Sequence, residues 1–339
     1  MSNAAIDDSL GALSTASNES NSTVDLKYKP FKEALPELVP FSVAIILANS
    51  IVFILFSKKN FLRTPANYLL FSLALCDFFT GCVNIPLAIT AFTQAVPYVK
   101  LPDVFYLVTV LHNFTAVATG YHILVITLET YLVFVWENRR PVSRNAIMRV
   151  LAVVWGASAI IAVVPFFWKS ELYANNPKAS ILQISHAVFC LAAVFFLPYM
   201  FIIYAHAVMF VAIKKTRQEM QVIQIGNEPI KAGCSDSEKR CLVIFVTMGT
   251  LYLVCWLPWF SLALILSLDE QNDSGIHITV SHVFVVVRYM TSVLNPVLYT
   301  FFKRDFYVAF KQVFLRKTPE ERLSLSDLET ARNSNRDEL

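Results

Sequence analysis

Long runs of apolar residues without a charged side chain make up most of the chain. Four of them contain no Asp, Glu, Lys or Arg and cover residues 38–57, 150–168, 179–213 and 241–268. Three more contain a single charge each: Asp77 within 64–99, Glu129 within 104–136 and Arg288 within 275–302. About 20 helical residues cross a bilayer, so every run is long enough. Because the runs are continuous and do not alternate as in a β-barrel, the pattern predicts seven transmembrane helices.

The composition agrees with a protein surrounded mainly by lipid. Of the 339 residues, 56% are hydrophobic and 16% are charged, against about 25% charged residues in an ordinary globular protein. Mean hydropathy is +0.54, which is too high for two soluble domains. With 8 Gly and 6 Cys in the whole chain, a collagen-like repeat and a disulfide scaffold are also excluded.

The basic residues between the apolar runs indicate an orientation. The first, third and fifth connections and the C-terminal tail carry 21 Lys and Arg, whereas the N-terminal segment and the other connections carry 6. Positive residues stay on the cytoplasmic side, so we expect an extracellular N-terminus and a cytoplasmic C-terminus in the plasma membrane. The net charge of +3 then reflects contact with the inner leaflet and requires no nucleic acid.

The same pattern divides the chain into four segments. We expect an extracellular tail over 1–36, a seven-transmembrane bundle over 37–302, an amphipathic helix over 303–316 and a disordered cytoplasmic tail over 317–339. No basic stretch followed by an apolar one opens the chain, so no cleaved signal peptide is expected. Sequons in the extracellular parts make Asn18, Asn21 and Asn272 candidate glycosylation sites.

Short motifs, nearly one per helix, resemble those of rhodopsin-like (class A) G-protein-coupled receptors over residues 35–315. They are Asn49 with Val52, Asn67 with Asp77, Trp155 with Pro165, Pro198, Cys255-Trp256-Leu257-Pro258, and Asn295-Pro296-Val297-Leu298-Tyr299 followed by Phe306. The resemblance implies an all-α, seven-transmembrane helix bundle with a short amphipathic eighth helix. It also implies a receptor, and no enzyme, that transmits a conformational signal from a ligand inside the bundle to the cytoplasm.

Proline positions within the apolar runs suggest where this bundle bends. Pro198, Pro258 and Pro296 each remove a backbone hydrogen bond from a membrane helix, which makes either a hinge or a static kink. Trp256 precedes Pro258 by two residues and either rotates under pressure from a ligand or packs in the core.

Asp77 is an acid at mid-depth in the membrane, where a bare carboxylate needs a cation, a proton or hydrogen-bond donors. The resemblance implies a sodium ion at this level, and the matching positions Thr119, Ser292 and Asn295 all carry oxygen. We therefore expect no cofactor other than a possible structural sodium ion, and a protonated, hydrogen-bonded Asp77 is the alternative.

The motifs that resemble the coupling region depart from the family pattern. Where the family has Asp-Arg-Tyr, this chain has Glu129-Thr130-Tyr131, and the arginine that meets the G protein is absent. His206 replaces a tyrosine of the fifth helix. Glu238 at the base of the sixth helix loses its usual arginine partner, for which Arg139 or Arg140 could substitute. A heterotrimeric G protein and an arrestin are the expected cytoplasmic partners, but these replacements predict weak G-protein coupling.

The expected ligand pocket also departs from well-known members of the family. His112 occupies the position of the acid that pairs with amine ligands, and Tyr289 that of the retinal-binding lysine of opsins. Beside it, Arg288 suits a carboxylate or another anion. The alternative is that Arg288 extends toward the membrane surface or reaches Asp77. The residues expected around a small, extracellular and anionic ligand are His112, Arg288, Tyr289, Trp256, Trp259 and Cys190.

Two further features concern disulfide bonds and the C-terminus. Phe105 stands where the family commonly has a cysteine, and 169–185 contains none, so we expect no structural disulfide. The C-terminal Arg336-Asp337-Glu338-Leu339 could add a strand to the groove of a PDZ protein.

Two further functions remain open. An atypical receptor that scavenges or heterodimerises would explain Thr130 and His206. A transporter could use Asp77, His112 and Arg288 as a path, although the chain lacks the inverted repeats typical of transporters.

Overall fold

The computed structural model describes residues 38–93, 101–135, 142–174, 176–223, 236–268 and 283–315, apart from residue 285. The candidate glycosylation sites Asn18, Asn21 and Asn272 lie outside these residues. So do the two tails, including the C-terminal four residues considered for a PDZ groove.

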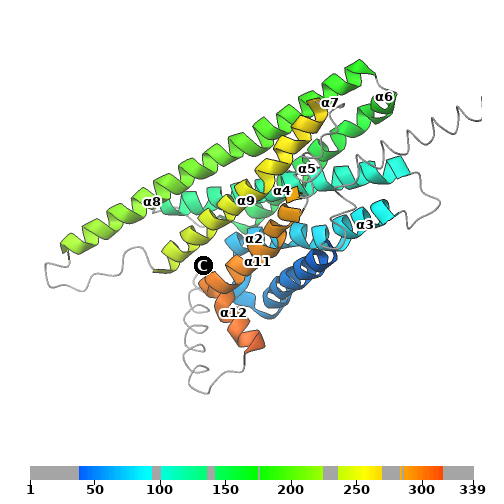
Figure 1. Ribbon diagram of the computed structural model, residues 1–339. Helices are drawn as coiled ribbons and strands as arrows, with labels where there is room; N and C mark the ends of the chain where they lie inside the picture. Colours follow the sequence, from blue (N-terminus) through cyan, green and yellow to red (C-terminus); the bar gives the residue numbers. More distant parts are fainter. Residues whose placement is uncertain are drawn as a thin grey trace, which may run out of the picture.

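Within these residues the protein is a bundle of long helices (Figure 1). Six helical spans are long and apolar enough to cross a membrane: Leu38–Lys58, Pro65–Thr90, Tyr106–Val133, Arg144–Leu172, Pro177–Ala212 and Leu242–Ile265. The seventh expected span is described from residue 283 onward and ends with α11 (Met290–Phe302). The all-α class of a seven-transmembrane bundle is confirmed.

The helical elements follow one another as the apolar runs predict, with several local changes of helix type. After the first span come η1 (Asn60–Leu62), α2 (Pro65–Phe79), the π-helical turn η2 (Thr80–Asn84), α3 (Ile85–Thr93) and α4 (Leu101–Val135). Then follow α5 (Arg144–Val163), η3 (Val164–Trp168), α6 (Lys169–Tyr173), α7 (Pro177–Phe189) and the π-helical turn η4 (Cys190–Phe196). The last elements are α8 (Leu197–Ile223), α9 (Asp236–Leu268), α11 and α12 (Arg304–Phe314).

Three helices begin with side chains that bind their first free N–H groups. The Thr64 and Ser143 side chains accept hydrogen bonds from the N–H of Asn67 and Ala146 and so cap α2 and α5. Asn176 caps α7 in the same way. These residue types are favoured as caps because their oxygens replace the missing partners of the first turn.

The helix α4 lies at the centre of the bundle and packs against α2, α3, α5, α8 and α9. By contrast, α5 is peripheral: Val153 and Ile160 are 69% and 67% exposed, whereas Val154 and Ser158 are buried. In a membrane protein such exposed apolar side chains face lipid. The buried side of α5 is tied to the bundle where Trp155 Nε1 donates to Ser72 Oγ over 2.9 Å.

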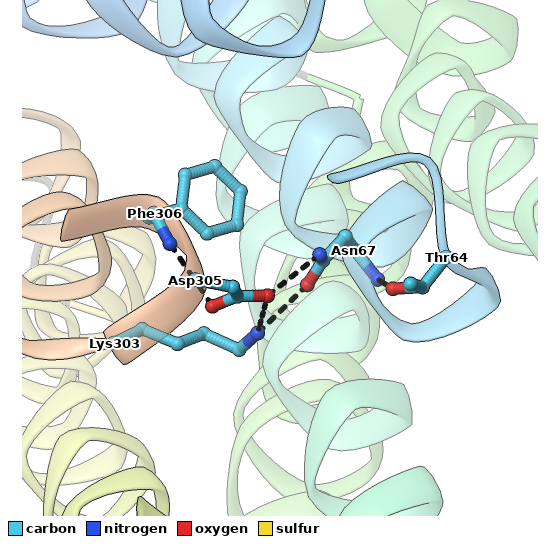
Figure 2. A network of polar contacts seen from close by, with 5 residues as sticks. All are labelled: Thr64, Asn67, Lys303, Asp305 and Phe306. Carbon is cyan, nitrogen blue, oxygen red and sulfur yellow. Dashed lines mark hydrogen bonds and ion pairs between the residues drawn. The ribbon is translucent and has the colours of Figure 1, made fainter. Parts of the chain in front are cut away.

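A polar network fixes the corner between α11 and α12 onto the start of α2 (Figure 2). Lys303 Nζ donates to Asn67 Oδ1 over 2.8 Å and to Asp305 Oδ2 over 2.6 Å. Asn67 Nδ2 donates to the same carboxylate oxygen over 2.9 Å, and the N–H of Phe306 donates to the other over 3.0 Å. The carboxylate of Asp305 therefore accepts from three groups: two from its own segment, Lys303 and Phe306, and one from Asn67 at the start of α2.

Burial alone would raise the pKa of Asp305. The positive charge of Lys303, with hydrogen bonds from Lys303, Asn67 and the Phe306 N–H, outweighs burial and lowers the pKa below its usual value. A carboxyl whose pKa is lower in the folded state adds stability above its unfolded pKa of about 4, and this stability is lost as pH falls through the folded pKa.

We expect Asp305→Asn to lower the melting temperature of the purified receptor in detergent by roughly 2–6 °C, because charge-assisted hydrogen bonds are lost. Between pH 5.5 and 8 the difference from the natural chain should stay constant, since Asp305 remains ionised throughout. Arg304→Gln, which removes an exposed charge next in sequence, is the control and should leave the melting temperature unchanged. A difference that varied over this pH range would contradict the assignment to Asp305.

Candidate functional site

A buried cluster of Arg288, His112 and Tyr289 joins the segment before α11 to α4. Arg288 Nη2 donates to His112 Nε2 over 2.8 Å and to the Tyr289 hydroxyl over 3.0 Å, and His112 also hydrogen-bonds that hydroxyl. All three side chains are at most 2% exposed. Because a guanidinium only donates, the His112 Nε2 atom accepts and carries no proton.

Aromatic rings enclose the Arg288 guanidinium. Its Cζ atom lies 4.0 Å from the centroid of the Trp259 ring and 4.8 Å from that of Tyr289. The Nε and Nη1 atoms of Arg288 are buried and have no hydrogen-bond partner. Asp77 is not among the partners of Arg288, so the alternative in which this arginine reaches Asp77 is not what the structure shows.

One hydrogen-bonded side chain connects this cluster to Trp256. Thr291 Oγ1 donates to the backbone carbonyl of Arg288 over 3.1 Å and accepts from Trp256 Nε1 over 3.2 Å. Sequence reasoning missed Thr291, although its place three residues after Arg288 puts both on one face of a helix. Thr291 therefore connects the backbone of Arg288 to the α9 residue that precedes Pro258 by two positions.

Two other expected pocket residues lie in an apolar layer around α9. Cys190 and Trp256 belong to a buried cluster that also contains Phe195, Tyr252 and Phe260. Cys190 hydrogen-bonds His186, and Arg288 is not among its described partners. Of the six expected pocket residues, the structure thus brings together His112, Arg288, Tyr289 and Trp259, links Trp256 to them through Thr291, and places Cys190 in the apolar cluster.

Asp77 forms a second polar site within the bundle and is fully buried. Ser292 Oγ donates to its Oδ1 over 2.7 Å, and Asn295 Nδ2 donates to its Oδ2 over 3.4 Å. Thr119 instead shares a hydrogen bond with Cys76 Sγ, at 3.9 Å. The Oδ1 atom of Asn295 is buried without a hydrogen-bond partner. Carboxylate, hydroxyl and amide oxygens at one level are the donors that a hard cation prefers, so the residues present fit a sodium ion.

Some of the residues expected to govern switching and coupling lie toward the end of the bundle that carries α12, and others lie deeper in the helices. Thr130 is 7% exposed and donates to the backbone carbonyl of Ile126 over 2.8 Å. The Tyr131 ring packs against Phe201 and Tyr204. The ring of His206 and the hydroxyl of Tyr299 each have a buried polar atom without a hydrogen-bond partner. Glu129 is half-buried on α4, Pro258 and Pro296 lie inside α9 and α11, and the side chain of Glu238 is outside the described residues.

An apolar contact joins α8 and α9 at this end. The buried side chains of Ala205, Met209 and Leu242 form one cluster, against which Tyr131 and Phe201 pack. The hydroxyl of Thr130 is satisfied within its own helix. At the position where the resemblance implies an arginine, α4 therefore carries the neutral Thr130, whose hydroxyl is hydrogen-bonded to the backbone of its own helix.

Comparisons with known proteins identify the class to which this fold and these sites belong. The family model described as 7 transmembrane receptor (rhodopsin family) matches residues 48–299. The chain therefore belongs to the rhodopsin family of seven-transmembrane receptors, which are G-protein-coupled receptors rather than enzymes. The expected class A resemblance is confirmed, and the protein is a multi-pass membrane receptor.

Individual relatives are distant. The 5-hydroxytryptamine receptor 1D of Rattus norvegicus is 25% identical over 331 residues, covering 80% of this chain and 86% of its own. The neuromedin-U receptor 2 of Homo sapiens is 23% identical, covering 81% of this chain and 70% of its own. The crystal structure of squid rhodopsin superposes with a TM-score of 0.69 at 18% identity, over 88% of this chain and 91% of that one, which supports the fold.

A close approach of α9 to α4 supports the layer beneath the cluster. A Cβ atom at Gly120 would lie 2.9 Å from Cζ of Tyr252 and still closer to its hydroxyl, which has no hydrogen-bond partner. A Cβ atom at Gly120 would thus require the buried Tyr252 side chain to shift.

We expect Gly120→Ala to destabilise the receptor by roughly 1–3 kcal/mol, because the added methyl group overpacks a buried contact. Tyr252→Phe removes the nearest atom, so the double variant should recover part of the lost melting temperature. Gly156→Ala, where nothing lies within 4 Å of the added atom, is the matched control and should not be destabilised. Additive losses in the double variant would show that Tyr252 is not the residue displaced.

Proposed function

We propose that this receptor lies in the plasma membrane with its N-terminus outside and binds a small extracellular ligand inside the bundle, next to Arg288. The observation that carries the proposal is the hydrogen-bonded path from Arg288 through Thr291 to Trp256. Ligand contact with Arg288 would displace α11 relative to α9, and Pro258 would let α9 bend. A heterotrimeric G protein and an arrestin would then read the change at the cytoplasmic end.

The relatives support a ligand-operated receptor without giving its ligand. Serotonin is an amine. Its protonated form would be repelled by the positively charged guanidinium of Arg288 in the cluster described above. His112 offers a neutral nitrogen that already accepts from Arg288. At 25% identity, the serotonin receptors therefore support the mode of action and not the chemical class of the ligand.

We further propose that coupling to G proteins is weak. An arginine can reach across the cytoplasmic cavity and offer five donors to a partner, whereas Thr130 offers one short hydroxyl. That hydroxyl is already bound to Ile126. The same observation favours the second candidate function, an atypical receptor that binds its ligand and scavenges it or heterodimerises.

The Asp77 site supports a further proposal, a structural sodium ion. Asp77, Ser292 and Asn295 would hold the ion, with Thr119 as an additional oxygen if it left Cys76. The ion would supply a positive charge to a fully buried carboxylate and would be coordinated by the unpaired Asn295 Oδ1. A protonated Asp77 that hydrogen-bonds its neighbours is the competing state.

Thr130→Arg is expected to raise basal nucleotide exchange about tenfold or more, because several charge-assisted hydrogen bonds become available to the G protein. The assay compares nucleotide exchange in membranes with matched receptor amounts and a panel of G proteins, and needs no ligand. Thr130→Lys should give a smaller gain, and Thr130→Val, which stays neutral, should give none. Robust exchange by the natural chain, unimproved by arginine, would remove the proposed weakness.

Replacing choline by sodium at constant ionic strength should raise the melting temperature of the natural receptor by roughly 2–4 °C, since an ion that binds only the folded state stabilises it. Asp77→Asn should abolish this sodium response while still folding, and Ser292→Ala should reduce it. An unchanged response in Asp77→Asn would exclude sodium from this site and favour the protonated carboxyl.

A further inference from the structure

Arg288 is a buried cation whose hydrogen-bond partners are neutral. Its side chain is 1% exposed, and the partners of its Nη2 atom are an unprotonated histidine nitrogen and a tyrosine hydroxyl. An arginine is charged at every accessible pH, so it cannot become neutral by losing a proton as a buried lysine can. Within the part of the chain that the structure describes, this positive charge is therefore surrounded by neutral dipoles and aromatic rings.

Most of the donors of Arg288 are also unused. A guanidinium carries five N–H groups, and the three on Nε and Nη1 have no acceptor. A buried donor without an acceptor is costly, and more so when it is charged. The cluster thus lacks two things at once: a negative charge, and acceptors for hydrogen bonds.

The described surroundings do not offer a carboxylate for this purpose. Asp77 already accepts from Ser292 and Asn295. The His112 nitrogen accepts from Arg288 itself, and the Trp259 and Tyr289 rings cover the guanidinium. Among the described residues, none is left to fill the place of this acceptor, which a ligand could therefore take.

We propose that the ligand of this receptor carries a carboxylate that accepts hydrogen bonds from the unpaired Nη1 N–H groups of Arg288. This inference rests on the proposed binding of a ligand inside the bundle and assigns its chemical class. A carboxylate brings both the charge and several planar acceptor lone pairs, which matches a guanidinium better than a spherical halide does. An amine would be repelled, and a neutral molecule would leave the charge of Arg288 uncompensated.

Carboxylate binding also explains how such a ligand would act on the receptor. The carboxylate would pull on the arginine side chain, whose backbone carbonyl is bound by Thr291 and, through it, linked to Trp256. The anion-binding group and the aromatic residue beside Pro258 are thus separated by a single threonine.

The test measures the melting temperature of the purified, full-length receptor in low-salt buffer with small probes. Choline acetate and choline formate at about 100 mM are compared with choline chloride, with neutral acetamide and with methylammonium chloride. Acetate and formate should raise the melting temperature by roughly 2–5 °C more than chloride, and acetamide and methylammonium should not. Choline replaces sodium throughout, so that the Asp77 site does not contribute.

Variants assign the effect to Arg288. In Arg288→Met the advantage of the carboxylates should disappear, whereas Arg149→Met, which removes an exposed arginine of α5, should retain it. Should Arg288→Met fail to fold, Arg288→Lys serves instead: it keeps the charge but has fewer donors, and its response should fall by at least half.

Three results would overturn the inference: no carboxylate effect on the natural chain, an equal effect in Arg288→Met, or an effect of chloride as large as that of acetate, which indicates a halide site. The melting assay involves no G protein. If carboxylates stabilise the receptor through Arg288 but the receptor never activates a G protein, this inference is supported. In that case only the proposed signalling function is contradicted.

Discussion

A polar group inside a bilayer finds no water, so its partners must come from the protein or from something that the protein binds. This constraint organises the interior of the receptor. The Thr130 hydroxyl is satisfied by its own helix, and the Asp77 carboxylate by Ser292 and Asn295 from α11. Arg288 is only partly satisfied, because its two neutral partners occupy a single nitrogen. The same rule that holds the bundle together thus marks the place where a ligand would complete it.

Much of the fold could be predicted from the sequence, because charge-free runs of about 20 residues have few alternatives to a membrane helix. The pairing of Ser292 with Asp77 and the neighbourhood of His112 and Arg288 also followed from positions shared with the family. The sequence could not show which rotamer each side chain adopts and therefore which neighbour it contacts. Sequence reasoning grouped Thr119 with Asp77, but the Thr119 hydroxyl turns to Cys76, and it overlooked Thr291, whose role depends on the side chain that α9 presents to it.

The network at the start of α12 was missed for a related reason. Asn67 and Asp305 are separated by 238 positions, and neither residue type suggests the other as a partner. Their contact depends on how the short helix turns away from α11 at Lys303, whose backbone is extended. The sequence motif around Phe306 predicted that a helix would follow α11, but the direction of that helix is a property of packing.

That corner also has a mechanical consequence. The helix α12 has 11 residues and is therefore a rigid arm roughly 16 Å long. Its first turn is held by hydrogen bonds to α2 and by the buried Phe306 ring, and Ala309 and Phe310 pack against the bundle further along. A force applied along the arm is transmitted to its anchored end, where it must either break the bonds to Asn67 or carry the first turn of α2 with it. Because α2 also holds Asp77, tension on the arm would act directly on the helix that carries the buried carboxylate.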